Sequence, residues 1–225
     1  MTRPKALLSW SSGKDSAYAL AEVRRADDID IVGLLTTVTA TYDRVAMHGV
    51  RRELLEAQAA ATGLPLTTVE LPTPCSNAQY EAALGATLAS ARKQDIVHVV
   101  FGDLFLEDIR AFREQQLAAH WMTGVYPLWG RDTATLAREM VGAGLRARLS
   151  CIDPKHLDRA FAGRVFDQAL LDELPAAVDP CGERGEFHTF VANGPIFDAP
   201  IPYAVGGVVL RDDRFAYCDL LPADT

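Results

Sequence analysis

Six residues near the N-terminus have the types and spacing of a phosphate-binding turn. They follow the apolar run 6–8, precede a helix-forming segment, and read Ser11, Ser12, Gly13, Lys14, Asp15 and Ser16. A turn between a buried strand and a helix leaves backbone N–H groups unpaired and directs the positive end of the helix dipole outward, which suits an anion. Lys14 adds a positive charge, and Ser11 and Ser16 add hydroxyl donors. The turn therefore predicts a phosphate site, with a plain capped turn as the alternative.

The pattern is not a Walker A loop. That loop needs Ser or Thr after Gly-Lys and a glycine five positions earlier, whereas this chain has Asp15 and Leu8 there. The order Ser-x-Gly-x-Asp-Ser instead resembles the PP-loop of the ATP pyrophosphatases, with Ser12 in place of the first glycine. The resemblance implies cleavage of ATP between its α- and β-phosphates.

A second group of polar residues follows the apolar run 96–101. Gly102 and Asp103 come directly after this strand-like run, and Arg110 and Arg113 follow at helical spacing. An aspartate at the carboxyl edge of a sheet could hold Mg²⁺ on phosphates. Either arginine could meet a phosphate or a substrate carboxylate. The alternative is a helix with a solvated, ion-paired face.

A third group lies in the glycine-rich segment 179–191. If a strand has begun at Glu186, then Glu186 and His188 share one of its faces and could pair a carboxylate with an imidazole for proton transfer. A turn with surface charges is the alternative. His48 precedes a predicted helix, where it could contact a base or occupy an ordinary turn.

Composition narrows the class of protein. The 225 residues carry a net charge of −8 with a pI near 5.1, which disfavours an extended nucleic-acid surface. No apolar run approaches the ~20 residues of a membrane span, and the N-terminus enters the first strand without room for a signal peptide. We expect a cytoplasmic protein that does not enter membranes. The four cysteines are scattered and predict free thiols rather than a zinc site.

The first half of the chain alternates strands and helices. Apolar runs predict strands at 6–10, 31–38, 66–71 and 96–101, and apolar periodicity predicts helices at 15–26, 50–61, 77–92 and 106–119. We expect Tyr80, Leu84, Leu88 and Ala91 on one face of the third helix, and Ile109, Phe112 and Gln116 on one face of the fourth. The alternation predicts an α/β fold with a parallel sheet.

The second half has a different pattern. A helix is predicted at 133–141, a half-exposed strand at 145–152, and a hairpin with strands at 208–210 and 215–217. We therefore predict a nucleotide-binding domain at 1–127, a smaller α+β domain at 128–225, and a cleft between them.

Together these segments resemble the diphthine–ammonia ligase family of PP-loop ATP pyrophosphatases. The resemblance rests on 11–16, 47–50, 102–114 and above all on the block Gly182-Glu-Arg-Gly-Glu-Phe-His-Thr189. It implies an adenine nucleotide α-hydrolase (HUP-like) domain facing a smaller domain that carries the block. It also implies a ligase that adenylates a carboxylate and converts the adenylate to an amide with ammonia.

The site expected from motifs and resemblance has three parts. Catalytic roles fall to Lys14, Asp103, Glu186 and His188, with Asp103 also holding Mg²⁺. Contacts to ATP fall to Ser9, Ser11, Ser12, Gly13, Lys14, Asp15, Ser16, Thr36, His48 and Gly102. Contacts to the acceptor substrate fall to Arg110, Glu183, Glu186 and Thr189.

The motif sequences Ser-Ser-Gly-Lys-Asp-Ser and Phe-Gly-Asp-Leu-Phe resemble the bacterial branch of the family, in which diphthine is not an expected substrate. The acceptor is then another carboxylate, on a small molecule or a protein, and a homodimer is possible. Two alternatives remain open: a PP-loop enzyme that modifies tRNA, and a non-catalytic adenine-nucleotide-binding protein.

Overall fold

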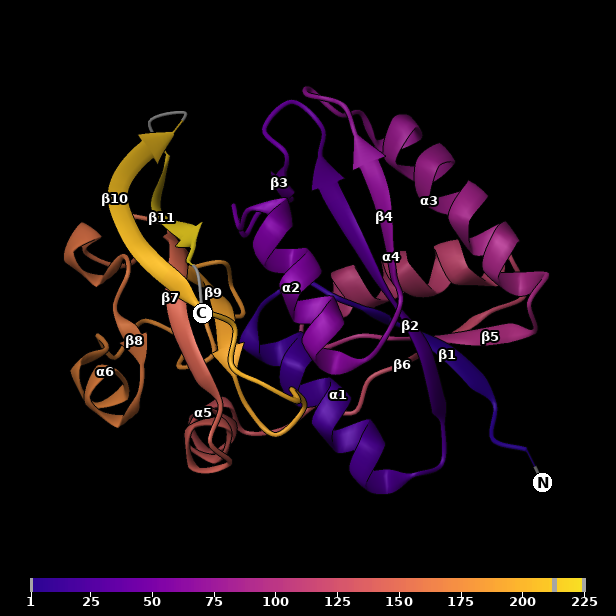
Figure 1. Ribbon diagram of the computed structural model, residues 1–225, viewed down its shortest axis with the longest axis horizontal. Coiled ribbons are helices and arrows are strands. Elements are labelled where there is room, and N and C mark those ends of the chain that lie inside the picture. Colours follow the sequence, from indigo (N-terminus) through magenta and orange to yellow (C-terminus); the bar gives the residue numbers. More distant parts are fainter. Residues whose placement is uncertain (1, 212–213, 224–225) are drawn as a thin grey trace.

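The computed structural model describes residues 2–211 and 214–223, which form two β-sheets with helices around them (Figure 1). Sheet A contains β1 (Lys5–Ser9), β2 (Asp30–Thr39), β4 (Leu66–Leu71), β5 (Ile96–Val100), β6 (Thr123–Val125) and the short β3 (Arg44–Val45). Five of these strands are parallel in the order β4-β2-β1-β5-β6, and β3 pairs antiparallel with the end of β2. The predicted parallel α/β architecture is confirmed.

Helices cover both faces of sheet A because consecutive strand residues point to opposite sides. The helices are α1 (Lys14–Ala26), α2 (Arg52–Thr62), α3 (Asn77–Arg92) and α4 (Glu107–Ala118). Leu8 of β1 joins the core cluster that includes α1 and α2, whereas Leu7 joins a second cluster with Leu88 of α3 and Leu117 of α4. The two layers are visible in Figure 1, where α3 and α4 lie together on the side away from sheet B.

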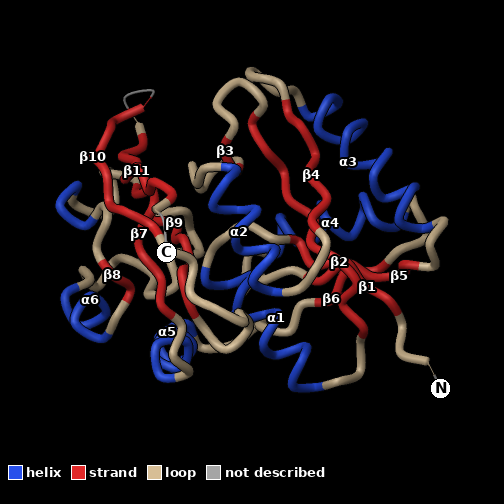
Figure 2. Tube along the Cα trace, viewed as in Figure 1, coloured by secondary structure: helices blue, strands red, loops and turns tan. Residues whose placement is uncertain are grey.

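Sheet B is antiparallel and belongs to the second half of the chain (Figure 2). Its strands are β7 (Arg146–Ile152), β8 (Val165–Phe166), β9 (Phe187–Asn193), β10 (Tyr203–Arg211) and β11 (Phe215–Pro222), accompanied by α5 (Thr133–Gly142), α6 (Gln168–Glu173) and the 3₁₀ turn η1 (Arg159–Phe161). β7 pairs with β9, β8 and β11, and β10 pairs with β11. The smaller α+β unit and its hairpin are confirmed, although turn residues 212–213 lie outside the described residues.

The half-exposed face predicted for β7 is confirmed at Arg146, which is exposed, and in part at Arg148, but it is wrong at Ser150. Ser150 is 2% exposed, and its hydroxyl donates to the His48 carbonyl at 3.0 Å. Local periodicity does not contain this tertiary neighbour. On α4, Ile109 and Phe112 are each 38% exposed, and Leu117 is the buried residue.

The two halves share one core. A single hydrophobic cluster includes Leu20 and Leu54 from the first half together with Leu149 and Phe190 from the second. In the described residues no helix is long and apolar enough to cross a membrane. The cysteines are free thiols, as predicted, with Cys75 exposed and the others buried.

Ser12 adopts a backbone conformation that favours glycine. Its φ is 68°, and its buried hydroxyl has no hydrogen-bond partner within the described residues. A left-handed conformation costs a non-glycine residue about 1–2 kcal/mol, and an unpaired buried hydroxyl adds to this cost.

We therefore predict that Ser12→Gly raises the free energy of unfolding by about 1 kcal/mol, after the entropy that glycine gains in the unfolded chain is subtracted. Urea unfolding with an unchanged m value is the measurement. Ser90→Gly on the exposed face of α3 is the matched control and should lower stability by about 0.5 kcal/mol. A destabilised Ser12→Gly protein would show that the serine hydroxyl has a structural partner.

Candidate functional site

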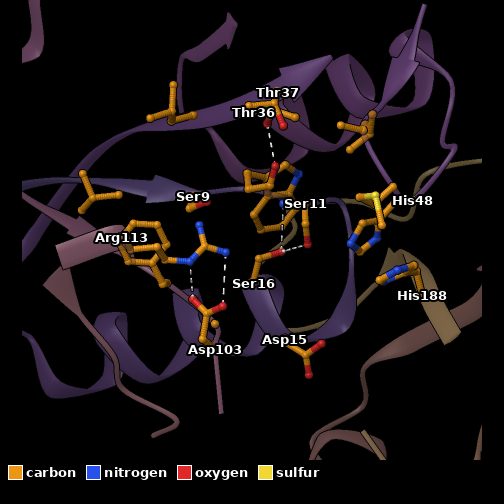
Figure 3. Close-up of a pocket in the computed structure, with 18 of the residues that line it drawn as sticks. Ser9, Ser11, Asp15, Ser16, Thr36, Thr37, His48, Asp103, Arg113 and His188 are labelled. Atoms are coloured by element: carbon orange, nitrogen blue, oxygen red, sulfur yellow. Dashed lines mark hydrogen bonds and ion pairs between the residues drawn. The ribbon is translucent and has the colours of Figure 1, made fainter. Parts of the chain in front are cut away.

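A cavity of about 340 Å³ opens at the carboxyl ends of the sheet A strands, where sheet B faces them. Its polar wall contains Ser9, Ser11, Asp15, Ser16, Thr36, Thr37, His48, Tyr80, Gly102, Asp103, Arg113, Gln116, Glu183 and His188. Figure 3 shows Ser11 and Ser16 near the centre, with Arg113 and Asp103 on one side and His48 and His188 on the other. Most of the residues predicted from sequence for nucleotide contact are thus brought together.

The 11–16 loop presents the start of α1 to this cavity. Gly13 is the N-cap of α1 and supplies no side-chain cap, so the positive end of the helix can meet an anion, although its first N–H group, that of Lys14, already donates to Thr189. The Ser11 and Ser16 hydroxyls lie 3.2 Å apart, and Ser16 Oγ donates to the Gly13 carbonyl at 3.0 Å. These contacts hold both hydroxyls at the rim of the helix N-terminus.

Gly102 is required where β5 ends against this loop. A Cβ atom on Gly102 would lie 2.7 Å from the carbonyl carbon of Asp15 and 2.8 Å from the backbone nitrogen of Ser16. Backbone atoms cannot move aside as a flexible side chain can. The absence of a side chain therefore sets how closely β5 approaches the N-terminus of α1.

Lys14 points away from the cavity, into the interface between the two halves. It is 2% exposed, its Nζ lies 2.9 Å from Asp15 Oδ2, and it also donates to the Cys181 carbonyl. The rings of Phe166 and Phe187 lie 5.5 and 5.4 Å from Nζ. The sequence placed this charge beside the phosphates, whereas the structure uses it to join the loop to the second half.

Burial is the largest single effect on the pKa of Lys14 and acts to lower it, but the charges of Asp15, Cys181 and Glu183 and the hydrogen bond to Asp15 together raise the net pKa. Lys14 therefore stays charged inside the protein. Ser12 and Gly13 are buried beside it, behind the cavity wall.

Gln58 and Thr189 complete this junction. Gln58 Nε2 donates to the carbonyls of Ser12 and Val191, and Val191 N donates to the Ser12 carbonyl at 3.0 Å. Thr189 Oγ1 accepts from Lys14 N at 3.0 Å. Thr189, predicted to contact substrate, is 1% exposed and instead positions the loop.

Asp103 lines the cavity, and its negative charge is paired with Arg113. Its Oδ2 lies 3.0 Å from Arg113 Nε, and its Oδ1 accepts from Arg113 at 3.2 Å (Figure 3). Arg113 also lies over the Phe101 ring at 4.5 Å. Arg110, the arginine chosen from sequence, is outside the cavity, paired with Glu114 and stacked over Tyr126 and Trp129. The arginine in the cavity is Arg113.

The two glutamates of the glycine-rich block, Glu183 and Glu186, have different surroundings. Glu183 lines the cavity and accepts from Leu104 N at 2.7 Å. Burial raises its pKa to about 7, with Asp15 and Asp103 adding to the shift. Glu186 is 2% exposed and accepts from the backbone nitrogens of Asp179 and Arg184 at 2.9 and 3.0 Å. The expected Glu186–His188 pair is not formed, because the Glu186 carboxylate folds the loop.

His188 instead lies against His48, with ring centroids 4.5 Å apart (Figure 3). His48 Nδ1 is 3.1 Å from the Thr189 carbonyl; because a carbonyl only accepts, Nδ1 carries the proton and Nε2 is an acceptor. Burial lowers the pKa of His48 to about 4 and the pKa of His188 well below 6.5, and the charge of Lys14 lowers both further. Both imidazoles are neutral at pH 7.

Thr36 reaches the cavity wall but its hydroxyl is used internally, donating to the Trp10 carbonyl at 2.7 Å. Four polar residues of the cavity wall were not selected from sequence: Thr37, Tyr80, Arg113 and Gln116. The sequence could have indicated Gln116, because it is a polar amide on the same side of the predicted helix as the apolar residues Ile109 and Phe112. Arg113 was indistinguishable from Arg110 by spacing alone.

The fold and site define an α/β protein in which the N-terminus of α1 lies at a cavity lined by residues of both halves. Residues 4–116 match the diphthamide synthase N-terminal domain, and residues 132–204 match the diphthamide synthase C-terminal domain. The chain belongs to this family, as its motifs predicted.

Named relatives are similar over nearly the whole chain. A diphthine–ammonia ligase of Danio rerio is 28% identical over 229 residues, covering 93% of this chain and 86% of the relative. One of Homo sapiens is 28% identical over 239 residues, covering 92% and 85%.

Lys14→Met should destabilise the protein by about 2–4 kcal/mol, because it leaves Asp15 without its buried partner. Chemical denaturation measures the loss. Asp15→Asn in the same chain removes the unpaired charge, so the double variant should recover at least half of the stability lost. A loss below about 1 kcal/mol would mean that solvent already screens the pair.

The raised pKa of Glu183 makes stability depend on pH. Between pH 4.5 and about 7 the folded state holds more protons than the unfolded chain, so the contribution of this carboxyl to stability is lost as pH rises through 7. Glu183→Gln should therefore be more stable than the parent at about pH 8.5, by on the order of 1 kcal/mol, but not at about pH 5. Urea unfolding at the two pH values tests this. The same stability difference at both would show that Glu183 titrates normally.

Proposed function

We propose that this chain is an ATP-dependent amide ligase that forms AMP and pyrophosphate and takes ammonia as the nitrogen donor. The observation that supports it best is the composition of one cavity. The N-terminus of α1, with Ser11 and Ser16, faces it from the first half, and Glu183 and His188 face it from the second. One cavity thus combines an anion site with a proton acceptor.

The chemistry has two balanced steps. The acceptor carboxylate attacks the α-phosphorus, and the bond to the β-phosphate breaks to release pyrophosphate and leave an acyl adenylate. Ammonia then attacks the acyl carbon, AMP leaves, and one proton must be removed to give the neutral amide. The adenylate divides one difficult substitution into two easier ones.

The residues in the cavity suit these steps. First-turn N–H groups of α1, the Ser11 and Ser16 hydroxyls and Arg113 bind and orient the phosphates. Glu183, with its pKa at about 7, takes the proton from the attacking nitrogen. The neutral His48 and His188 offer acceptor nitrogens to ammonia without competing as cations.

Mg²⁺ fits this cavity as a companion of ATP. Magnesium bound to a nucleotide takes most of its ligands from phosphates and water and needs only one or two carboxylates. Asp103, and Asp15 beside it, line the cavity and would hold the ion. Each is balanced by a cation of the chain, Arg113 or Lys14. Bound Mg²⁺ would neutralise charge on the departing pyrophosphate.

The experiment supplies ATP, Mg²⁺, ¹⁵N-ammonium and a set of carboxylic acids, and follows AMP, pyrophosphate and labelled amide. We expect the three products in equal amounts with one acid. AMP without nitrogen incorporation would contradict the ligase proposal, and nucleotide binding without any AMP would favour a non-catalytic binding protein.

The two glutamates provide a paired test of mechanism. Glu183→Gln should lower amide formation by about 10²–10⁴-fold while ATP affinity stays within about threefold. Glu186→Gln should instead destabilise the fold by about 1–3 kcal/mol, because its amide NH₂ would face a backbone N–H. Turnover, ATP affinity and urea unfolding of both variants separate the roles. Loss of turnover in folded Glu186→Gln with an active Glu183→Gln would reverse the assignment.

A further inference from the structure

We infer that Gln116 recognises the base of the nucleotide and selects adenine over a 6-oxopurine. This inference rests on the proposed function, which places ATP in the cavity. The observation that carries it is a buried amide nitrogen without a partner in the apolar part of the cavity wall.

The cavity extends from the 11–16 loop in two directions. Toward the second half it reaches His48 and His188, and in the other direction it passes Asp103 and Arg113 (Figure 3). Beyond Arg113 the lining comes from α3, α4 and the sheet, and it is mainly apolar: Leu35, Leu84, Leu88, Val99, Phe101 and Leu117. Flat apolar walls suit a purine ring, whereas the triphosphate needs the polar centre.

Gln116 is a polar exception in this part of the lining. Its Nε2 is buried and has no hydrogen-bond partner within residues 2–211 and 214–223. An unpaired buried donor costs about 1–3 kcal/mol, and few buried polar groups in folded proteins are left in this state. An apolar residue of similar size would avoid that cost, which points to a bound group as the missing partner.

The neighbouring polar side chain is already committed. Arg113, one turn earlier on α4, is held by Asp103 and packed on Phe101. The Arg113 guanidinium can therefore form one side of the base site, but it cannot reorient to form hydrogen bonds with the edge of the base. The Gln116 amide is left as the group that can offer a donor and an acceptor side by side.

That pair complements adenine. The amide oxygen accepts from the 6-amino group while Nε2 donates to the adjacent ring nitrogen N7. On this edge a 6-oxopurine presents two acceptors, O6 and N7, so one of them faces the amide oxygen whichever way the amide is turned. Hydrogen-bonding sites of this kind discriminate strongly, because the mismatched groups lose water without gaining a partner.

The experiment compares the dissociation constants of ATP, GTP and ITP, which carries the 6-oxo group without the 2-amino group of guanine. The protein as it stands should bind ATP about 10- to 100-fold more tightly than ITP. Gln116→Met keeps the volume and removes both polar atoms, so it should weaken ATP and bring the two affinities within about threefold. Gln115→Met, at the exposed neighbouring position, is the matched control and should change nothing.

Stability gives a readout that a structural role would not produce. Gln116→Met removes an unpaired donor, so its melting temperature should equal or exceed that of the parent. Gln116→Glu keeps the acceptor and loses the donor; its charge weakens all nucleotides alike, so the ratio of ATP to ITP affinity is the measurement. This second variant decides the question if Gln116→Met does not fold.

The outcomes separate the two proposals. If ATP binds and the ratio of ATP to ITP affinity is unchanged in the Gln116 variants, the base assignment is overturned while the proposed function stands. If the parent protein binds none of the three nucleotides, both are overturned. A ratio that collapses only in the Gln116 variants supports both.

Discussion

The attachment of the 11–14 segment to β9 is the constraint on which the cavity depends. The Ser12 carbonyl accepts from Val191 N and from Gln58 Nε2, and Lys14 N donates to Thr189 Oγ1. Two of these contacts join residues more than 170 positions apart, and the third comes from Gln58 of α2. Breaking one leaves an unpaired backbone group in the core, so the loop and the second half are held in one arrangement. The N-terminus of α1 and Glu183 therefore face the same cavity.

Charge at this junction is arranged so that the cavity stays accessible to anions. Lys14 carries the buried positive charge, and its attraction to Asp15, Cys181 and Glu183 together outweighs the effect of its burial. On the other side of the loop, Arg113 balances Asp103. Burial raises the pKa of the remaining carboxyl, Glu183, to about 7, and the charge of Lys14 only partly opposes this rise. A carboxyl that is partly protonated near neutrality repels a triphosphate less than a fixed anion would.

Local sequence patterns predicted those features that depend on neighbours along the chain. The third helix was placed at 77–92 and lies there, because Ser76 and Gln79 form a capping box and Leu88 and Ala91 fall on its buried face. The strand–turn–helix at 11–16 was likewise visible in the order of residue types. The predicted exposed face of β7 is wrong at Ser150 alone, because that side chain is covered by the His48 carbonyl, which lies about one hundred positions away in sequence.

In the site, too, sequence patterns could not reveal contacts between residues that are distant along the chain. Residue type showed that Lys14, Glu186 and Thr189 are unusual, and all three are buried at the junction between the halves. Type alone could not show that their side chains bind backbone groups of this chain, those of Cys181 for Lys14, Asp179 and Arg184 for Glu186, and Lys14 for Thr189. Arg110 and Arg113 are alike by sequence, and only the rotation of α4 against Phe101 decides that Arg113 meets the cavity.

The turn at Gly182 explains why Glu183 lies at the cavity whereas Glu186 stabilises the loop. Gly182 has a φ of 69°, and a Cβ there would lie 2.7 Å from the Phe187 carbonyl oxygen, so the chain turns back on itself at this point. The turn directs Glu183 outward to the cavity. It also brings the backbone nitrogens of Asp179 and Arg184 onto the Glu186 carboxylate. Each oxygen of Glu186 accepts one of these hydrogen bonds, so the side chain holds the loop closed. The proposed mechanism therefore assigns the proton-accepting role to Glu183, whose Oε1 accepts from Leu104 N while its other oxygen accepts no backbone hydrogen bond within the described residues.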